Sequence, residues 1–203
     1  MIILWSFQKK YLKMEVQDVD LPLSANFKQF RIEHYNLDMT CNFEQHTFDS
    51  TVLLSITSGP EWKGETDLVL DCSDIEVQDV RTRDSENEKR LEFSMTKWAI
   101  TVFLPASEKE RLGVGQVISL IITYRTVPKS RSLHWRQNCD GSICVYTAAA
   151  SINNRGLFPC QVTAGGFRQE LKESQSPFVR MFGSSLSRAV NLHLSRSESN
   201  QSN

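Results

Sequence analysis

The feature that most limits the fold of this chain is an alternation of apolar and polar residues, which runs from about Phe27 to Tyr146. It is clearest in residues 91–96, where leucine, phenylalanine and methionine alternate with glutamate, serine and threonine. This period of two puts every second side chain on one face of a β-strand. Similar segments are Phe30–Thr40, His46–Thr57, Asp67–Cys72, Ile75–Val80, Trp98–Leu104 and Val117–Thr126. The pattern predicts an all-β domain, built as an antiparallel β-sandwich or a barrel.

The sequence between these segments is typical of turns, with short runs rich in glycine, proline, serine and aspartate at 58–60, 72–74 and 113–115. The charged run Arg81–Arg90 has two interpretations, a recognition arm or a solvated hairpin tip. Its mixed signs favour the hairpin tip. Helix signals are scarce, and the best one, Ser107–Leu112 after Pro105, predicts a single turn at most.

The phase of the alternation also predicts which side chains form the core. We expect the residues at in-phase positions of separate strands to be buried together. They are Leu53, Leu68, Leu70, Phe93, Trp98, Val102, Leu120 and Ile122.

Charge and composition argue against several classes of partner. The 203 residues carry 23 Lys and Arg against 24 Asp and Glu, a formal net charge of -1. This balance provides no basic field for nucleic acid or for an anionic membrane. No apolar run has the length of a transmembrane helix, and the apolar N-terminus, Met1–Trp5, is too short for a secretion signal.

The cysteines and the C-terminal region complete the expected organisation. The 5 cysteines are an odd number without a Cys-x-x-Cys pair, which favours reduced thiols and a cytoplasmic or nuclear location. After Gln161 the chain becomes rich in serine, which predicts a disordered or weakly helical tail. The expected parts are an N-terminal extension over 1–13, the sandwich over 14–161, and this tail over 162–203.

Residue chemistry alone predicts no active site. No two histidines have the His-Glu-x-x-His spacing of a zinc peptidase, and no Gly-x-Ser-x-Gly nucleophile motif occurs. Cys139 and Cys144 have no second pair with which to form a metal site. We therefore expect no catalytic residue, no metal ligand and no cofactor in this chain, and we expect His34 and His46 to be half-buried sheet residues. The four histidines are His34, His46, His134 and His193.

One region resembles a known family. The segments concerned are Ser132–Trp135, Cys144–Thr147 and Ile152–Gln161. They resemble the N-terminal domain of the gluzincin zinc aminopeptidases, in which an Arg-x-x-x-Pro-Cys segment leads into the catalytic domain. Arg155, Pro159 and Cys160 match that segment, and Asn153 and Asn154 precede it. The resemblance implies a saddle-like β-sandwich, and it assigns these five residues to the junction with a catalytic domain.

Further segments support and limit this resemblance. Leu68–Asp74 looks like a family strand, and Asp20–Asn26 looks closest to the aminopeptidase O branch. The family usually has glutamine five residues before the junction arginine, where this chain has Ala150. The zinc helix and the exopeptidase loop of the family do not follow Gln161. The resemblance thus implies a truncated or alternatively spliced form, with zinc only in the full-length parent.

Two functions remain open from the sequence. The chain is either the non-catalytic N-terminal domain of an aminopeptidase O-like enzyme, or a stand-alone binding or regulatory module. Such a module would pair through sheet edges or through the face that the catalytic domain would have covered. In the first case peptides are substrates of the full-length parent only. In both cases we expect Leu157 and Phe158 to lie on an uncovered face that favours self-association or a protein partner, with no nucleic acid and no membrane involved.

Overall fold

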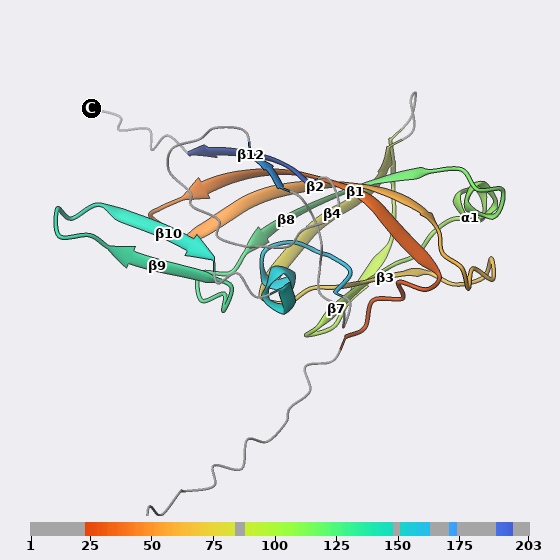
Figure 1. Cartoon of the computed structure of the whole chain (residues 1–203), viewed down its shortest axis with the longest axis horizontal. Coiled ribbons are helices and arrows are strands. Elements are labelled where there is room, and N and C mark those ends of the chain that lie inside the picture. The colour runs from red at the N-terminus through yellow and green to blue at the C-terminus, as the bar shows by residue number, and fades with distance from the viewer. Residues whose placement is uncertain (1–22, 84–87, 148–150, 163–170, 174–189, 197–203) are drawn as a thin grey trace, which may run out of the picture.

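The computed structural model of the chain describes residues 23–83, 88–147, 151–162, 171–173 and 190–196. Its largest element is a seven-stranded sheet in the order β11-β12-β1-β2-β8-β4-β5 (Figure 1). The strands of this sheet, in that order, are Leu171–Glu173, Val190–Arg196, Phe30–Asn42, Thr47–Ser58, Ile118–Thr126, Ile75–Arg83 and Glu88–Arg90. Along this order, β1, β2, β8, β4 and β5 are each antiparallel to their neighbours in that group. Strand β12 is parallel to both β1 and β11.

Two smaller sheets complete the described fold. A three-stranded sheet has the order β3-β7-β6, and β9 pairs with β10 in a two-stranded hairpin. These strands are β3 (Leu68–Asp71), β6 (Phe93–Met95), β7 (Ala99–Val102), β9 (Leu133–Gln137) and β10 (Ile143–Thr147). The described helical segments are α1 (Ala106–Gly113) and the 3-10 helix η1 (Ser151–Gly156). The prediction of a mostly antiparallel all-β fold is confirmed.

The seven-stranded and three-stranded sheets bury their facing sides in one core. Leu54 and Leu120 of the large sheet belong to the same cluster as Leu70 and Val102 of the small sheet. Within β1 the buried positions change phase at a bulge between Ile32 and His34, which keeps the apolar residues on both sides of the bulge turned inward. Apolar residues from both sheets thus form a single sandwich-like core.

The predicted core positions are mostly correct. The five that are fully buried are Leu68, Leu70, Val102, Leu120 and Ile122. Phe93 and Trp98 are partly buried. The prediction that Leu53 lies in the core is wrong, because the residues of β2 that face inward are Val52, Leu54 and Ile56. Three apolar residues stand in a row at 52–54, so the sequence leaves the inward phase undecided there.

The β9–β10 hairpin extends sideways from the large sheet (Figure 1), and Trp135, in the middle of β9, packs against residues near the β1–β2 turn. The Trp135 ring stacks on His46 with 4.7 Å between centroids, and it also contacts Phe43 and Phe48. His34 and His46 are both partly buried, as expected. His34 lies in β1, but His46 lies in the turn before β2, with a positive φ of 55°.

The remaining secondary-structure predictions have mixed outcomes. The predicted hairpin at 81–90 is confirmed where it is described, because β4 pairs with β5. The helix after Pro105 has 8 residues and is longer than the single turn expected. In the tail, the described segments β11 and β12 are paired strands rather than helix, and the expectation of a disordered or weakly helical tail stays a prediction for the rest of 162–203. The predicted extension over 1–13 lies outside the described residues, as does most of 162–203.

Candidate functional site

The segment that follows η1 lies between the edges of the two larger sheets. Cys160 pairs with Asp71, the last residue of β3, through two backbone hydrogen bonds of 2.8 and 3.0 Å. Close by, the Ser73 N–H donates to the Arg155 carbonyl over 2.8 Å. The two stretches that resemble family segments, around Asp71 and around Arg155, are therefore hydrogen-bonded to each other although they are far apart in sequence.

Asp71 provides a buried carboxylate at this junction. Asp71 is fully buried, and its carboxylate accepts three backbone hydrogen bonds. Ser24 and Ala25 donate to Oδ1 over 2.6 and 3.1 Å, and Val162 donates to Oδ2 over 3.1 Å. Bonds to an ionised acceptor are stronger than neutral ones, and a buried charge needs such donors. Asp71 thus joins the start of the described chain to the end of the junction segment.

Gln161 makes the corresponding contact with the large sheet. Its side-chain amide lies beside β1, donating from Nε2 to the Phe30 carbonyl over 2.7 Å and accepting from the Ile32 N–H over 3.2 Å. Its own backbone N–H donates to the Tyr35 hydroxyl over 3.2 Å. The amide satisfies one acceptor and one donor of β1 in the same way as a neighbouring strand would. We refer to Asp71, Cys160, Gln161 and Val162 as the junction clasp.

Aromatic and apolar packing closes the space behind the junction clasp. The Phe158 ring meets the Tyr35 ring edge to face, with 5.6 Å between centroids. Leu157 and Phe158 are only 3% and 4% exposed. The expectation that these two residues form an uncovered apolar face is therefore wrong, because they pack into the domain's own core.

Arg155 is buried at the same place, at 3% exposure. Its guanidinium lies 4.8 Å from the centroid of the Trp98 ring, and that of Arg131 lies 5.0 Å from the same ring. A cation over an indole face is attracted by the ring quadrupole, more strongly when water is excluded. Trp98 also accepts a hydrogen bond from the Cys72 N–H through its carbonyl, over 3.0 Å. Arg155 thus helps to hold the junction in place through its buried contact with the Trp98 ring.

The 3-10 helix η1 is fixed by two serines of the loop between β8 and β9. The Ser132 hydroxyl donates to the Asn153 carbonyl, and the Ser130 hydroxyl donates to the Gly156 carbonyl over 3.1 Å. A Cβ atom at Gly156 would lie 2.2 Å from Ser132 Oγ, so this close approach requires glycine. The Asn154 carbonyl accepts from the N–H groups of residues 157 and 158, which turns the chain towards Pro159.

The thiols around the junction have raised pKa values. Burial, with a further contribution from the Asp71 charge, raises the pKa of Cys72 to about 12, and Arg155 opposes this shift. Burial and the same carboxylate raise the pKa of Cys160 well above its ordinary value. Because the thiolate is the reactive form of cysteine, a raised pKa makes these two thiols poor nucleophiles. No disulfide joins the cysteines of the described residues.

Thiol labelling provides a first prediction. At pH 8 an aromatic disulfide reagent should label Cys139 first, since it is exposed, and Cys144 more slowly, since it is partly buried. Cys41, Cys72 and Cys160 are buried and should react only after unfolding. The measurement is the time course of labelling in buffer and in denaturant, with mass spectrometry to assign the sites. Rapid labelling of Cys160 in the folded chain would contradict the buried junction.

A second prediction concerns the buried amide of Gln161. In Gln161→Glu a neutral carboxyl can still donate to the Phe30 carbonyl, whereas a carboxylate faces that carbonyl without a proton. Burial then raises the pKa of the new carboxyl in the folded state above its unfolded value. Since the folded state holds the proton more tightly, the variant should be closest to the parent chain at low pH and lose stability as pH rises.

The measurement is denaturant unfolding of Gln161→Glu and the parent chain between pH 4 and 8. The matched control is Gln116→Glu at an exposed position after α1, which should show no such trend. A stability difference between Gln161→Glu and the parent chain that is the same at every pH would show that the amide is not held against β1.

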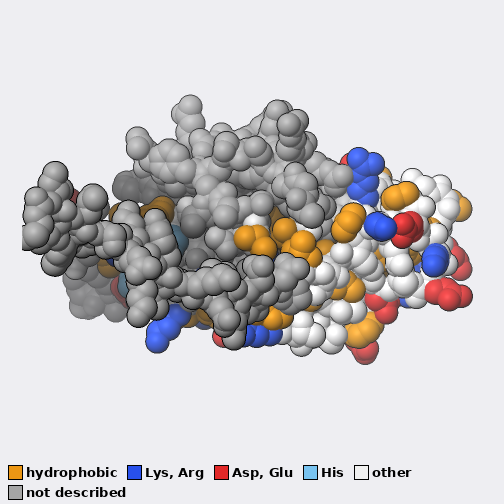
Figure 2. All heavy atoms as spheres, turned by 60° about the horizontal axis from the view of Figure 1, so that its bottom comes forward, with side chains coloured by type: hydrophobic (Ala, Val, Ile, Leu, Met, Phe, Trp, Pro, Cys, Tyr) orange, Lys and Arg blue, Asp and Glu red, His pale blue; other side chains and the backbone are white. Residues whose placement is uncertain are grey.

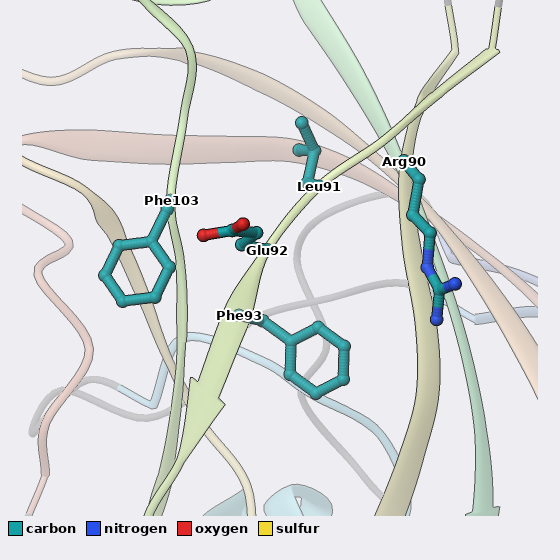
Figure 3. Close-up of a pocket in the computed structure, with 5 residues that line it drawn as sticks. All are labelled: Arg90, Leu91, Glu92, Phe93 and Phe103. Atoms are coloured by element: carbon teal, nitrogen blue, oxygen red, sulfur yellow. The ribbon is translucent and has the colours of Figure 1, made fainter.

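The described residues offer little for catalysis. No group of three or more His, Cys, Asp or Glu side chains in them could hold a metal ion. A hollow of about 460 Å³ lies beside β6, lined by Arg90, Leu91, Glu92, Phe93 and Phe103. The Glu92 carboxylate points towards the Phe103 ring across it (Figure 3). Apart from Arg90 and Glu92 the lining is apolar.

In Figure 2 a group of apolar side chains lies near the middle of the face shown, and towards the right-hand end apolar and charged side chains are mixed. The exposed large apolar residues include Val114 at 75%, Phe103 at 42% and Met95 at 38%. Among the described segments, no helix has the length and apolar character needed to span a membrane.

The five residues that the resemblance assigns to a junction lie in one stretch from η1 to the edge of β3. They are Asn153, Asn154, Arg155, Pro159 and Cys160, and their place beside a catalytic domain stays a prediction. The sequence does not predict the roles of Asp71 and Gln161. Nothing in it alone shows that the Asp71 carboxylate accepts three hydrogen bonds, or that the Gln161 side chain pairs with β1. Trp98 was expected in the core, and its contact with Arg155 was not foreseen. Ala150 lies outside the described residues.

Comparison with known proteins identifies the class of this domain. Residues 31–161 match the family model described as the peptidase M1 N-terminal domain. The chain belongs to this family. The match ends at Gln161, the residue that pairs with β1 in the junction clasp.

The relatives are peptidases and leukotriene hydrolases. A leukotriene A-4 hydrolase homolog of Botryotinia fuckeliana is 29% identical over 68% of this chain, and leucine aminopeptidase 2 of Saccharomyces cerevisiae is 28% identical over 70%. Human aminopeptidase O is 36% identical, but over only 35% of this chain and 9% of its own length. The chain spans 22% and 21% of the lengths of the first two relatives.

Solved structures agree on the fold. Native yeast leukotriene A4 hydrolase superimposes with a TM-score of 0.55 at 25% identity, covering 68% of this chain and 21% of the other. A second structure of the native Saccharomyces cerevisiae enzyme gives a TM-score of 0.58 at 22% identity, covering 73% and 23%. The domain therefore has the fold of the N-terminal region of these larger proteins.

Proposed function

We propose that this chain is the non-catalytic N-terminal domain of an aminopeptidase O-like zinc metallopeptidase, whose parent removes N-terminal residues from peptides. The observation that carries the proposal is the junction clasp, which coincides with the end of the family match. Both sheets hold the chain at residues 160–162. Residues 160–162 are therefore held firmly at the end of the family match, as a rigid connection to a following domain requires.

Zinc belongs to the parent in this proposal. The described residues offer no group of three ligands, so they do not fit a zinc site. The contribution of this chain is then to form one wall beside the catalytic domain. A reducing location, cytoplasmic or nuclear, is consistent with an exposed Cys139 and with unlinked thiols in the described residues.

The test is docking to a catalytic domain. The full chain is mixed with the part of human aminopeptidase O that follows its matched region, and the complex is measured by sedimentation velocity. We expect a one-to-one complex. Asn153 and Asn154 are partly exposed beside the clasp, so Asn153→Asp with Asn154→Asp should weaken it by about tenfold or more.

A matched control separates this effect from changes of net charge. Ser94→Asp with Ser107→Asp adds two negative charges at exposed positions of β6 and α1, and it should leave the affinity unchanged. A chain that remains monomeric and forms no complex would overturn the proposal. That result would favour a stand-alone binding module.

A further inference from the structure

The outer edge of β1 is the place where the antiparallel part of the large sheet ends. Strand β1 has 13 residues and pairs along its inner side with β2. A long sheet edge presents unpaired backbone donors and acceptors, and it can pair with another extended chain. What covers this edge therefore decides what the domain can bind.

Two different groups cover successive parts of the edge. Near its start, the Gln161 side-chain amide bonds the Phe30 carbonyl and the Ile32 N–H. Beyond the bulge, the strand β12 pairs in parallel with Tyr35–Cys41, with Leu192 opposite Leu37 in the register. The first cover belongs to the junction clasp. The second is a segment from the far end of the chain.

The attachment of β12 is made through strand pairing. In the described fold its sheet neighbours are β1 and the three-residue strand β11. Pairing of this kind depends mainly on backbone hydrogen bonds, and it is the mode by which sheet edges bind extended peptides. A separate peptide of the same sequence can therefore form the same ladder.

The edge is poorly suited to pairing with a second copy of itself. Asp38 lies at the centre of the stretch Tyr35–Cys41 and is exposed. In a symmetric antiparallel pair over this stretch, Asp38 would face the Asp38 of the other copy. Like charges directly opposite each other are destabilising. In β12 the residue opposite Asp38 in the register is His193.

We infer that the β1 edge from Tyr35 to Cys41 is a strand-binding site and that Val190–Arg196 is its ligand, bound in cis in this chain. When β12 is detached from β1, the edge binds a separate peptide of the same sequence. The site is distinct from the junction, so it stands or falls independently of the proposed docking to a catalytic domain.

The experiment uses the full chain carrying Leu192→Pro and His193→Pro. Successive backbone N–H groups of a strand point in opposite directions, so one of these two prolines removes a donor to β1. A labelled peptide of residues 189–197 is titrated and followed by fluorescence anisotropy. We expect saturable binding to the variant, and about 100-fold weaker apparent binding to the parent chain because the cis strand competes at high effective concentration.

Two controls make the outcome specific. A peptide with prolines at the same two positions should not bind, and a chain with Ser199→Pro and Asn200→Pro, beyond β12, should behave as the parent chain. Hydrogen exchange checks the fold. The amides of residues 35–41 that point towards β12 should exchange at least about tenfold faster in the variant, while those that point towards β2, and those of β2 and β8, stay protected.

The opposite results are equally clear. If β2 and β8 stay protected but the variant binds no peptide, the edge is not a strand-binding site. If sedimentation shows that the variant dimerises and excludes the peptide, the ligand of the edge is a second copy rather than this segment. Unchanged exchange at residues 35–41 would show that β12 does not cover β1.

Discussion

Replacing Asp71 with alanine should lower the free energy of unfolding by about 3–5 kcal/mol, the largest effect expected from a polar substitution in this chain. The carboxylate is fully buried and accepts the N–H groups of Ser24, Ala25 and Val162. Alanine leaves all three donors without their acceptor. Each hydrogen bond to a charged group contributes about 1.5–3 kcal/mol, and partial access of water reduces the sum.

The measurement is denaturant unfolding monitored by tryptophan fluorescence. Asp71→Asn should cost less than Asp71→Ala, because one amide oxygen still serves the donors at Oδ1 while the amide nitrogen cannot accept from Val162. Glu110→Ala on α1 removes an exposed carboxylate and is the control. If Asp71→Ala and Glu110→Ala have the same small effect, the junction clasp does not hold the domain together.

Leu54→Ala should destabilise the domain by about 3 kcal/mol, whereas Leu53→Ala should cost about 1 kcal/mol. Leu54 is 0% exposed in the shared core, and its truncation leaves a cavity between the two sheets. Leu53 is on the opposite face of β2 and is partly exposed. The two variants remove the same atoms from adjacent residues, so side-chain chemistry is matched.

The difference between the two unfolding free energies measures the phase of β2 directly. Thermal unfolding by circular dichroism serves as a second probe. A larger loss for Leu53→Ala would reverse the inward face of the strand, and with it the register of β2 against β1 and β8.

The strands could be predicted because their signal is local. Alternation fixes the face of a residue where apolar and polar residues strictly alternate, as from Tyr35 to Cys41, where Leu37 and Met39 are both buried. It fails where apolar residues are consecutive, as at Leu53, and where a bulge shifts the phase, as after Ile32. Strand pairing across the chain, such as that of β12 with β1, has no local signal.

The candidate site was predictable only in part, for the same reason. Its residues from Asn153 to Cys160 could be located by their resemblance to a family motif. The function of Asp71 depends on three donors that are distant in sequence. The burial of Phe158 depends on Tyr35, which the sequence does not connect with it. Contacts of this kind follow from the sheet topology.

The most direct test of the central claim is hydrolysis of aminoacyl amides by the pure full chain with zinc added. We predict no turnover above buffer, because a metallopeptidase needs a metal-activated water and the described residues offer no group of three ligands. Turnover that scales with the concentration of the chain, survives repurification and is lost in His34→Ala or His134→Ala would contradict the account of a non-catalytic domain.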